Sequence, residues 1–177
     1  IKIEIFPSMT LGGKPTELYR QARDGFIDIT WTVAGYTPGV FQRSEVFELP
    51  TIHKGSARDT NILINKHFNL IKDDYKNLKP LLIHVHTGGT LFLVDKQINS
   101  LENLEKLKIR TPSRTGAWLL SKLNVKPVGM PLPDLPGALS KNVVDGALIP
   151  YEIIKPLRLE QFVKFSYEGR NKSKFGT

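Results

Sequence analysis

Arg110 has the clearest chemical potential in this sequence, because it ends a short strand predicted at residues 108–110 and is followed by Thr111 and Pro112. Proline cannot donate a hydrogen bond to a neighbouring strand, so Pro112 is expected to end the strand beside Arg110. A helix is predicted to begin near Ser113, and the amides at a helix start favour negative charge. The guanidinium group offers a planar fork of donors that matches a carboxylate. An anion site is therefore reasonable here, although on local grounds alone a surface or ion-paired arginine is the simpler interpretation.

His84 and His86 form a second candidate pair, since they share one face of an apolar strand predicted at residues 81–86. An H-x-H pair can bind a metal ion, but no third ligand is evident. A hydrogen-bonding role for one of them in a cleft and a satisfied position in the core both stay open. The glycine-rich bend at residues 87–90 lacks the Gly-Lys-Ser/Thr ending of a phosphate-binding loop. We therefore predict no metal and no cofactor.

Three carboxylates, Asp28, Asp134 and Asp145, could in principle act as general acids or bases. No nucleophile elbow, cofactor fingerprint or metal triad accompanies them in the sequence. Asp145 precedes a glycine and is better explained by a turn. We predict that the protein is not an enzyme.

The elements that must position these residues follow an α/β pattern. In the first half, strands are predicted at residues 1–6, 26–33 and 81–86, separated by a helix that Gly25 ends and by a long helix at residues 56–78. In the second half we predict a strand at 91–95, a helix at 113–122, a strand at 125–128, a helix from 133 to a left-handed stop at Asn142, and strands at 143–149 and 160–165.

Open α/β sheets bind ligands beyond the carboxyl ends of their strands, and several predicted strand ends converge on one crevice. For the aromatic residues among them, packing in the core or in a loop is an equally good interpretation. The predicted binding residues are Trp31, Tyr36, His86, Thr90, Arg110, Ile149, Pro150 and Tyr151.

Four blocks of the sequence resemble the solute-binding proteins of tripartite ATP-independent periplasmic (TRAP) transporters, the DctP family. Residues 103–112 resemble that family's DLKGLKIRVP signature. Residues 127–131 and 138–146 resemble its PVPMPFSEVYEALQTGVVDG stretch, and residues 7–13 and 25–29 resemble PSGQLGGEREMIEQVRDGTVDM. The blocks stand in family order and cover most of the chain, so together they are a specific signal.

This resemblance implies a periplasmic-binding-protein-like fold of type II, with two α/β lobes that close on the ligand by hinge motion. Residues 1–88 would form lobe I, to which the chain returns at about 158–177, and residues 89–157 would form lobe II. In the family, the arginine that maps onto Arg110 grips the substrate carboxylate. The implied function is capture of an organic acid in the periplasm, as a monomer, for delivery to the TRAP membrane permease. A sensory or regulatory domain for a small carboxylate is the alternative.

Two departures from the family pattern bear on the ligand. Acidic-sugar binders carry a second arginine where this chain has Thr90, and an asparagine where it has Ile149. Loss of a cation and an amide disfavours a sugar acid. With Trp31, Tyr36 and Tyr151 near, we prefer a monocarboxylate with an apolar or aromatic body, while a small 2-oxo or hydroxy acid or a dicarboxylate stays open.

Composition excludes several other classes. Cysteine is absent, which excludes disulfide scaffolds and thiolate chemistry. The formal net charge is +8, but the lysines and arginines are scattered, so we predict no nucleic-acid binding. The chain has 177 residues and begins directly on an alternating stretch. Family members are longer at both ends, so we expect an interior fragment or a truncated gene, without the opening strand and helix and the C-terminal part.

Overall fold

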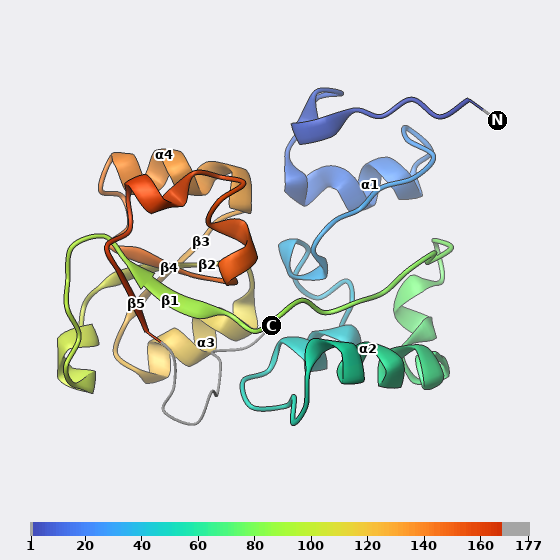
Figure 1. Cartoon of the computed structure of the whole chain (residues 1–177). Coiled ribbons are helices and arrows are strands. Elements are labelled where there is room, and N and C mark those ends of the chain that lie inside the picture. The colour runs from blue at the N-terminus through green and yellow to red at the C-terminus, as the bar shows by residue number, and fades with distance from the viewer. Residues whose placement is uncertain (1, 168–177) are drawn as a thin grey trace.

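A five-stranded mixed sheet occupies the second half of the chain in the computed structural model, which describes residues 2–167 (Figure 1). The strand order is β3-β2-β4-β1-β5; β2 is parallel to β3 and β4, whereas β1 is antiparallel to β4 and β5. The bounds are β1 Thr90–Leu93, β2 Lys108–Thr111, β3 Lys126–Gly129, β4 Gly146–Ile149 and β5 Phe165–Tyr167. The strands predicted at 91–95, 108–110 and 125–128 are confirmed to within two residues, whereas the one predicted at 143–149 begins three residues later. Of the strand predicted at 160–165 only Phe165 belongs to β5, because a 3₁₀ turn occupies Leu159–Gln161.

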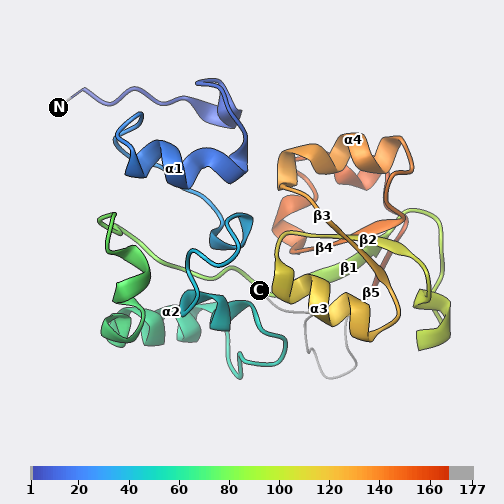
Figure 2. The ribbon, with the colours of Figure 1, turned by 180° about the vertical axis from the view of Figure 1, so that it is seen from behind.

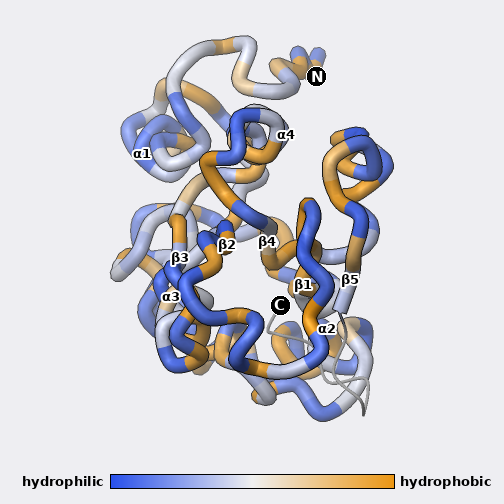
Figure 3. The backbone as a smooth tube through the Cα atoms, turned by 90° about the vertical axis from the view of Figure 1, so that its left-hand side faces the viewer, coloured by the Kyte–Doolittle hydropathy of each residue, from blue (hydrophilic) through white to orange (hydrophobic). Residues whose placement is uncertain are grey.

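Two helices cover the two faces of this sheet, as Figures 1 and 2 show. The helix α3 (Arg114–Lys122) packs with the cluster that contains Leu91 and Ile109, and α4 (Leu135–Ser140) packs with the cluster that contains Phe92 and Ala147. The central strand β4 consists mainly of apolar residues, as the hydropathy colours of Figure 3 indicate. It is buried along its whole length, because it is covered on both faces and both edges.

The local signals that start and stop the helices are confirmed. Ser113 caps α3, since its Oγ accepts a hydrogen bond from the amide of Gly116. Asn142 and Gly25 both have positive φ angles, of 54° and 77°, as predicted for left-handed stops.

The first half of the chain differs from the prediction. Its helices are α1 (Leu18–Arg23) and α2 (Ala57–Lys66), and residues 2–88 contain no strand. The stretches predicted as strands at 1–6, 26–33 and 81–86 have no ladder partner among the described residues, and their apolar side chains, such as those of Trp31 and Leu82, are largely exposed. A strand exists only through hydrogen bonds to a neighbour, so an alternating sequence alone does not produce one.

Two contacts nevertheless hold the stretch at 81–86 in place. The side-chain amide of Asn61 on α2 donates to the carbonyl of Val85 (3.0 Å) and accepts from its amide (2.7 Å), as a neighbouring strand would. The indole of Trp31 donates to Nε2 of His84, and the two rings stack. The stretches 26–33 and 81–86 therefore lie beside each other at Trp31 and His84.

The long helix predicted at residues 56–78 is also shorter than expected. It ends at Lys66 and continues as 3₁₀ turns at Phe68–Leu70 and Lys72–Tyr75. The carboxylate of Asp74 accepts hydrogen bonds from the amides of Arg43 and Ser44 and from the Ser44 hydroxyl. These tertiary hydrogen bonds hold the 3₁₀ turn at Lys72–Tyr75 in place, although the apolar periodicity of the sequence predicts a continuous helix there. None of the helices in residues 2–167 is sufficiently long and apolar to span a membrane.

Candidate functional site

Arg110 lies on β2, level with Ala147 of β4, and is 3% exposed. Its Nε donates to the carbonyl of Met130 (3.0 Å), and its Nη1 donates to the carbonyl of Leu148 (3.4 Å). The ion pairs made by arginines in residues 2–167 involve Arg23, Arg43 and Arg114, so Arg110 has no carboxylate partner in that part of the chain. Burial lowers the pKa of the Arg110 guanidinium, and only the Tyr36 hydroxyl opposes this shift.

A buried cation with neutral partners alone is costly, because the desolvation of the charge is not offset by a counter-ion. An anion that reaches the guanidinium would remove this cost. Arg110 thus has the burial and the unpaired charge of an anion-binding group, which excludes the surface interpretation.

Tyr36 brings the first half of the chain to this arginine. It ends a 3₁₀ turn at Ala34–Tyr36, and its hydroxyl accepts a hydrogen bond from the amide of Leu132 (2.9 Å) while it also interacts with Arg110. The predicted pair of Tyr36 and Arg110 is therefore brought together, across 74 residues of chain.

Thr90, Ile149 and Pro150 lie beside them. Thr90 on β1 is paired with Ile149 on β4, and both residues are almost completely buried. Arg110 pairs with Ala147, two residues before Ile149, so the side chains of Thr90, Ile149 and Arg110 point to the same face of the sheet. Pro150, also buried, follows directly.

The remaining three predicted residues, Tyr151, His86 and Trp31, contact residues outside this group. The ring of Tyr151 packs edge-on against Phe92 (centroids 4.9 Å apart), and its hydroxyl donates to Ser166. His86 is half-buried and its ring contacts the carbonyl of Thr87. Trp31 is 82% exposed, and its contacts are with His84. A ligand role for these three stays a prediction.

Sequence reasoning missed Glu48, a carboxyl at the contact between the two halves of the chain. The Thr115 hydroxyl on α3 donates to its Oε2 (3.1 Å), and Ser113 is a second hydrogen-bonding partner. Burial raises the pKa of Glu48, and the negative charge of Glu45 adds to the rise, whereas His86 and the two hydroxyls lower it. Nothing in the local sequence marks Glu48, because its partners lie 65 or more residues away.

The ion pair of Glu45 with Arg114 was missed for the same reason. Arg114 Nε donates to Glu45 Oε2 (2.8 Å), and the amide of Gly39 donates to the other oxygen (2.9 Å). Glu45 is 8% exposed, while the Arg114 side chain reaches solvent. Together with Glu48, this pair connects the 3₁₀ segment Ser44–Glu48 to the start of α3.

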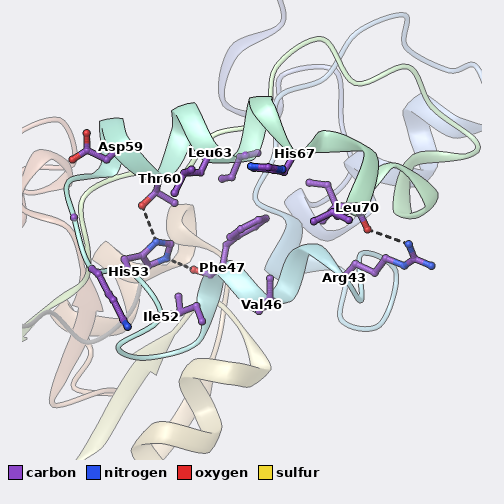
Figure 4. A pocket seen from close by; sticks show the side chains of 14 residues that line it. Arg43, Val46, Phe47, Ile52, His53, Asp59, Thr60, Leu63, His67 and Leu70 are labelled. Atoms are coloured by element: carbon purple, nitrogen blue, oxygen red, sulfur yellow. Dashed lines mark hydrogen bonds between the residues drawn. The ribbon is translucent and has the colours of Figure 1, made fainter.

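An apolar cavity of about 600 Å³ lies elsewhere, between α2 and residues 43–54 (Figure 4). Two of its basic side chains are already engaged: His53 bonds Thr60 and the carbonyl of Phe47, and Arg43 bonds the carbonyl of Leu70 and pairs with Asp73. This cavity therefore lacks the unpaired buried cation found at Arg110, and we do not assign the carboxylate site to it.

Comparison with known proteins identifies the family of this chain. Residues 1–171 match the model of bacterial extracellular solute-binding proteins, family 7. The chain is similar to an uncharacterized protein of Haemophilus influenzae, with 30% identity over 93% of this chain and 51% of the relative.

Two solved structures are similar as well. A TRAP solute-binding protein from an unidentified marine microbe, specific for aromatic acid ligands and in complex with 3-hydroxybenzoate, is 42% identical with a TM-score of 0.88, over 93% of this chain and 52% of that one. A TRAP solute-binding protein from Rhodoferax ferrireducens in complex with benzoate is 39% identical with a TM-score of 0.82, over 93% and 51%.

This chain thus spans about half the length of the relatives that it matches. The match with the family model covers nearly all of its residues, and its fold is that of the corresponding half of the matched structures. The chain belongs to the bacterial extracellular solute-binding proteins of family 7, the solute-binding proteins of TRAP transporters.

Proposed function

We propose that this protein is the periplasmic solute-binding subunit of a TRAP transporter, which captures an organic monocarboxylate through Arg110 and delivers it to the membrane permease. The observation that carries the proposal is the burial of Arg110 without a carboxylate partner in residues 2–167. A ligand carboxylate would supply the missing counter-ion by a two-point salt bridge, in surroundings where exclusion of water strengthens the bond.

The surroundings of Arg110 favour a ligand with one charge and an apolar body. Ile149, Pro150 and the ring of Tyr36 present little that would stabilise a second carboxylate. Thr90 occupies the position at which sugar-acid binders carry their second cation. Two relatives about 40% identical to this chain were found with benzoate and with 3-hydroxybenzoate. An aromatic monocarboxylate is therefore the ligand class that we propose.

The contacts between the two halves of the chain support closure around such a ligand. We assign residues 1–88 to one lobe and 89–157 to the other, with a return of the chain to the first lobe from about 158; of that return, residues 168–177 lie outside the described part. Tyr36 meets Leu132, Glu45 meets Arg114, and Thr87 donates to Glu152 (2.6 Å) across this boundary. Each contact joins a residue before 89 to one after it, as a closed cleft requires.

Substitution of Arg110 tests the proposal. The protein is expressed from its complete reading frame, and binding of benzoate or a hydroxybenzoate is measured by titration calorimetry. We expect Arg110→Gln to weaken this binding by about 30-fold to several thousand-fold, because removal of one partner of a buried charge pair costs about 2–5 kcal/mol. Arg58→Gln on the exposed side of α2 is the matched control and should bind like the wild type. Unchanged affinity in Arg110→Gln would refute the assigned anchor.

A further inference from the structure

Thr90 carries the one buried side-chain polar atom in residues 2–167 that has no hydrogen-bond partner, its hydroxyl Oγ1. The residue is 1% exposed, so bulk water does not reach this hydroxyl. A buried polar group without a partner costs about 1–3 kcal/mol. Unpaired groups of this kind are uncommon in folded proteins and call for a specific explanation.

The position of Thr90 relative to Arg110 offers that explanation. The two residues lie on β1 and β2, the strands that flank β4, and their side chains point to the same face of the sheet. Adjacent strands are about 4.8 Å apart, so the two backbones are separated by about 10 Å. The guanidinium already extends toward Thr90, since Nη1 reaches the carbonyl of Leu148, the neighbour of Ile149. A flat body lying over Ile149 would thus have one end at the cation and the other at the hydroxyl.

The chemistry of the two ends differs. Arg110 is a cation that donates only, while a threonine hydroxyl is neutral and both donates and accepts. A second carboxylate at Thr90 would be buried without a cation, which is unfavourable. A ligand hydroxyl at that end can both give and receive a hydrogen bond. The neighbours Ile149 and Phe92 are apolar, so a bound water would find few of the two to four partners that it needs.

We propose that Thr90 is a specificity-determining residue that hydrogen-bonds a hydroxyl group of the ligand, so that the preferred ligands are hydroxy-substituted aromatic monocarboxylates rather than the unsubstituted acids. This inference rests on the proposed function of the Arg110 site and narrows its ligand class. It assigns the carboxylate to Arg110 and the discrimination between related acids to Thr90.

The test measures, by titration calorimetry, the affinities for benzoate and its 2-, 3- and 4-hydroxy derivatives. Four proteins expressed from the complete reading frame are compared: the wild type, Thr90→Val, Thr90→Ser and the control Thr10→Val. Valine has nearly the shape of threonine without the hydroxyl, and serine keeps the hydroxyl. The control Thr10 is exposed in the first half of the chain. We expect at least one hydroxybenzoate to bind the wild type about tenfold more tightly than benzoate, and Thr90→Val to bring the ratio of these two affinities to about one. Thr90→Ser and Thr10→Val should keep the preference.

The outcomes separate this inference from the proposed function. If the wild type binds benzoate and its hydroxy derivatives equally, or if Thr90→Val weakens all four acids by the same factor, Thr90 does not read a hydroxyl and the inference is overturned, while the role of Arg110 stands. If a preference survives in Thr90→Val, another residue supplies it and the inference is again overturned. If no acid binds the wild type, the proposed function falls as well.

Discussion

At the scale of single residues, the site is defined by the polar groups of Arg110, Thr90 and Glu48 and by the partners of each group. Arg110 is buried with neutral acceptors and no carboxylate in residues 2–167, and Thr90 is buried with no partner. Glu48 is a half-buried carboxyl whose hydrogen-bonding partners, Thr115 and Ser113, are hydroxyls. Each group therefore carries an electrostatic or hydrogen-bonding cost that the packing around it imposes.

The raised pKa of Glu48 predicts the pH dependence of stability. Because its pKa in the folded protein lies above the ordinary value of 4.5, the folded state binds more protons than the unfolded state between these two pKa values. The free energy of unfolding contributed by Glu48 therefore falls as pH rises through that interval. Glu48→Gln removes the charge but keeps an oxygen that can accept from Thr115. We expect it to raise the free energy of unfolding at neutral pH, with a gain that shrinks as pH falls toward the ordinary glutamate range.

Urea unfolding across about pH 4 to 8 measures this difference. The exposed Glu105→Gln is the matched control and should show no comparable gain at neutral pH. A Glu48→Gln protein whose stability relative to the wild type does not depend on pH would contradict the role given to burial.

At the scale of elements, the position of Arg110 depends on how closely α3 packs against β2. The two meet at Gly116, where an added Cβ would collide with Oγ1 of the buried Thr111, next to Arg110 in the strand. A glycine in a helix is unfavourable by itself, and here the close approach requires it. In α4, by contrast, a Cβ at Gly137 would meet nothing within 4 Å.

The two helical glycines thus give a matched pair of substitutions. Gly116→Ala is expected to lower the free energy of unfolding by about 1–3 kcal/mol, because the helix or the strand must shift. It should weaken ligand binding too, since the shift moves the strand of Arg110. Gly137→Ala is expected to be neutral or to stabilise by up to about 1 kcal/mol. Thermal unfolding and calorimetry on both variants check this, and equal effects would show that the packing at Gly116 can relax.

At the scale of the whole molecule, the first half of the chain meets the sheet through few polar contacts. Among the described residues, the ion pair of Glu45 with Arg114 is the salt bridge that joins a residue before position 89 to a residue after it. Glu45 is buried and Arg114 reaches solvent, so this pair lies between the weak surface pairs and the strong buried ones. In a binding protein that closes on its ligand, such contacts form on closure and add to ligand affinity.

Loss of this pair should therefore favour the open form. We expect Arg114→Gln to reduce carboxylate affinity by about 3- to 30-fold and to raise the radius of gyration of the protein without ligand, with saturating ligand restoring the smaller value. Small-angle X-ray scattering and calorimetry measure the two effects, with the exposed Arg20→Gln as control. An affinity loss without a change in size would place the effect in the site and not in closure.

The sequence alone determined the elements whose signals are local. The strand and helix around Arg110, the Ser113 cap and the left-handed stops at Gly25 and Asn142 follow from proline, glycine, capping residues and short periodic runs, which act over a few residues. The same motifs carried the family resemblance, and they identified Arg110 as the anchor candidate before any contact was visible.

Only the tertiary structure decided what depends on distant partners. The stretches at 26–33 and 81–86 are predicted as strands from their apolar patterns yet form none, because a ladder needs a neighbour that a local pattern does not specify. The bonds of Glu45 and Glu48 to α3 join residues 67 to 69 positions apart. Whether a buried group is paired is likewise a property of everything packed around it. Both proposals rest on two such properties within residues 2–167, the missing counter-ion of Arg110 and the unpaired hydroxyl of Thr90. For that reason they could be seen only once the chain was folded.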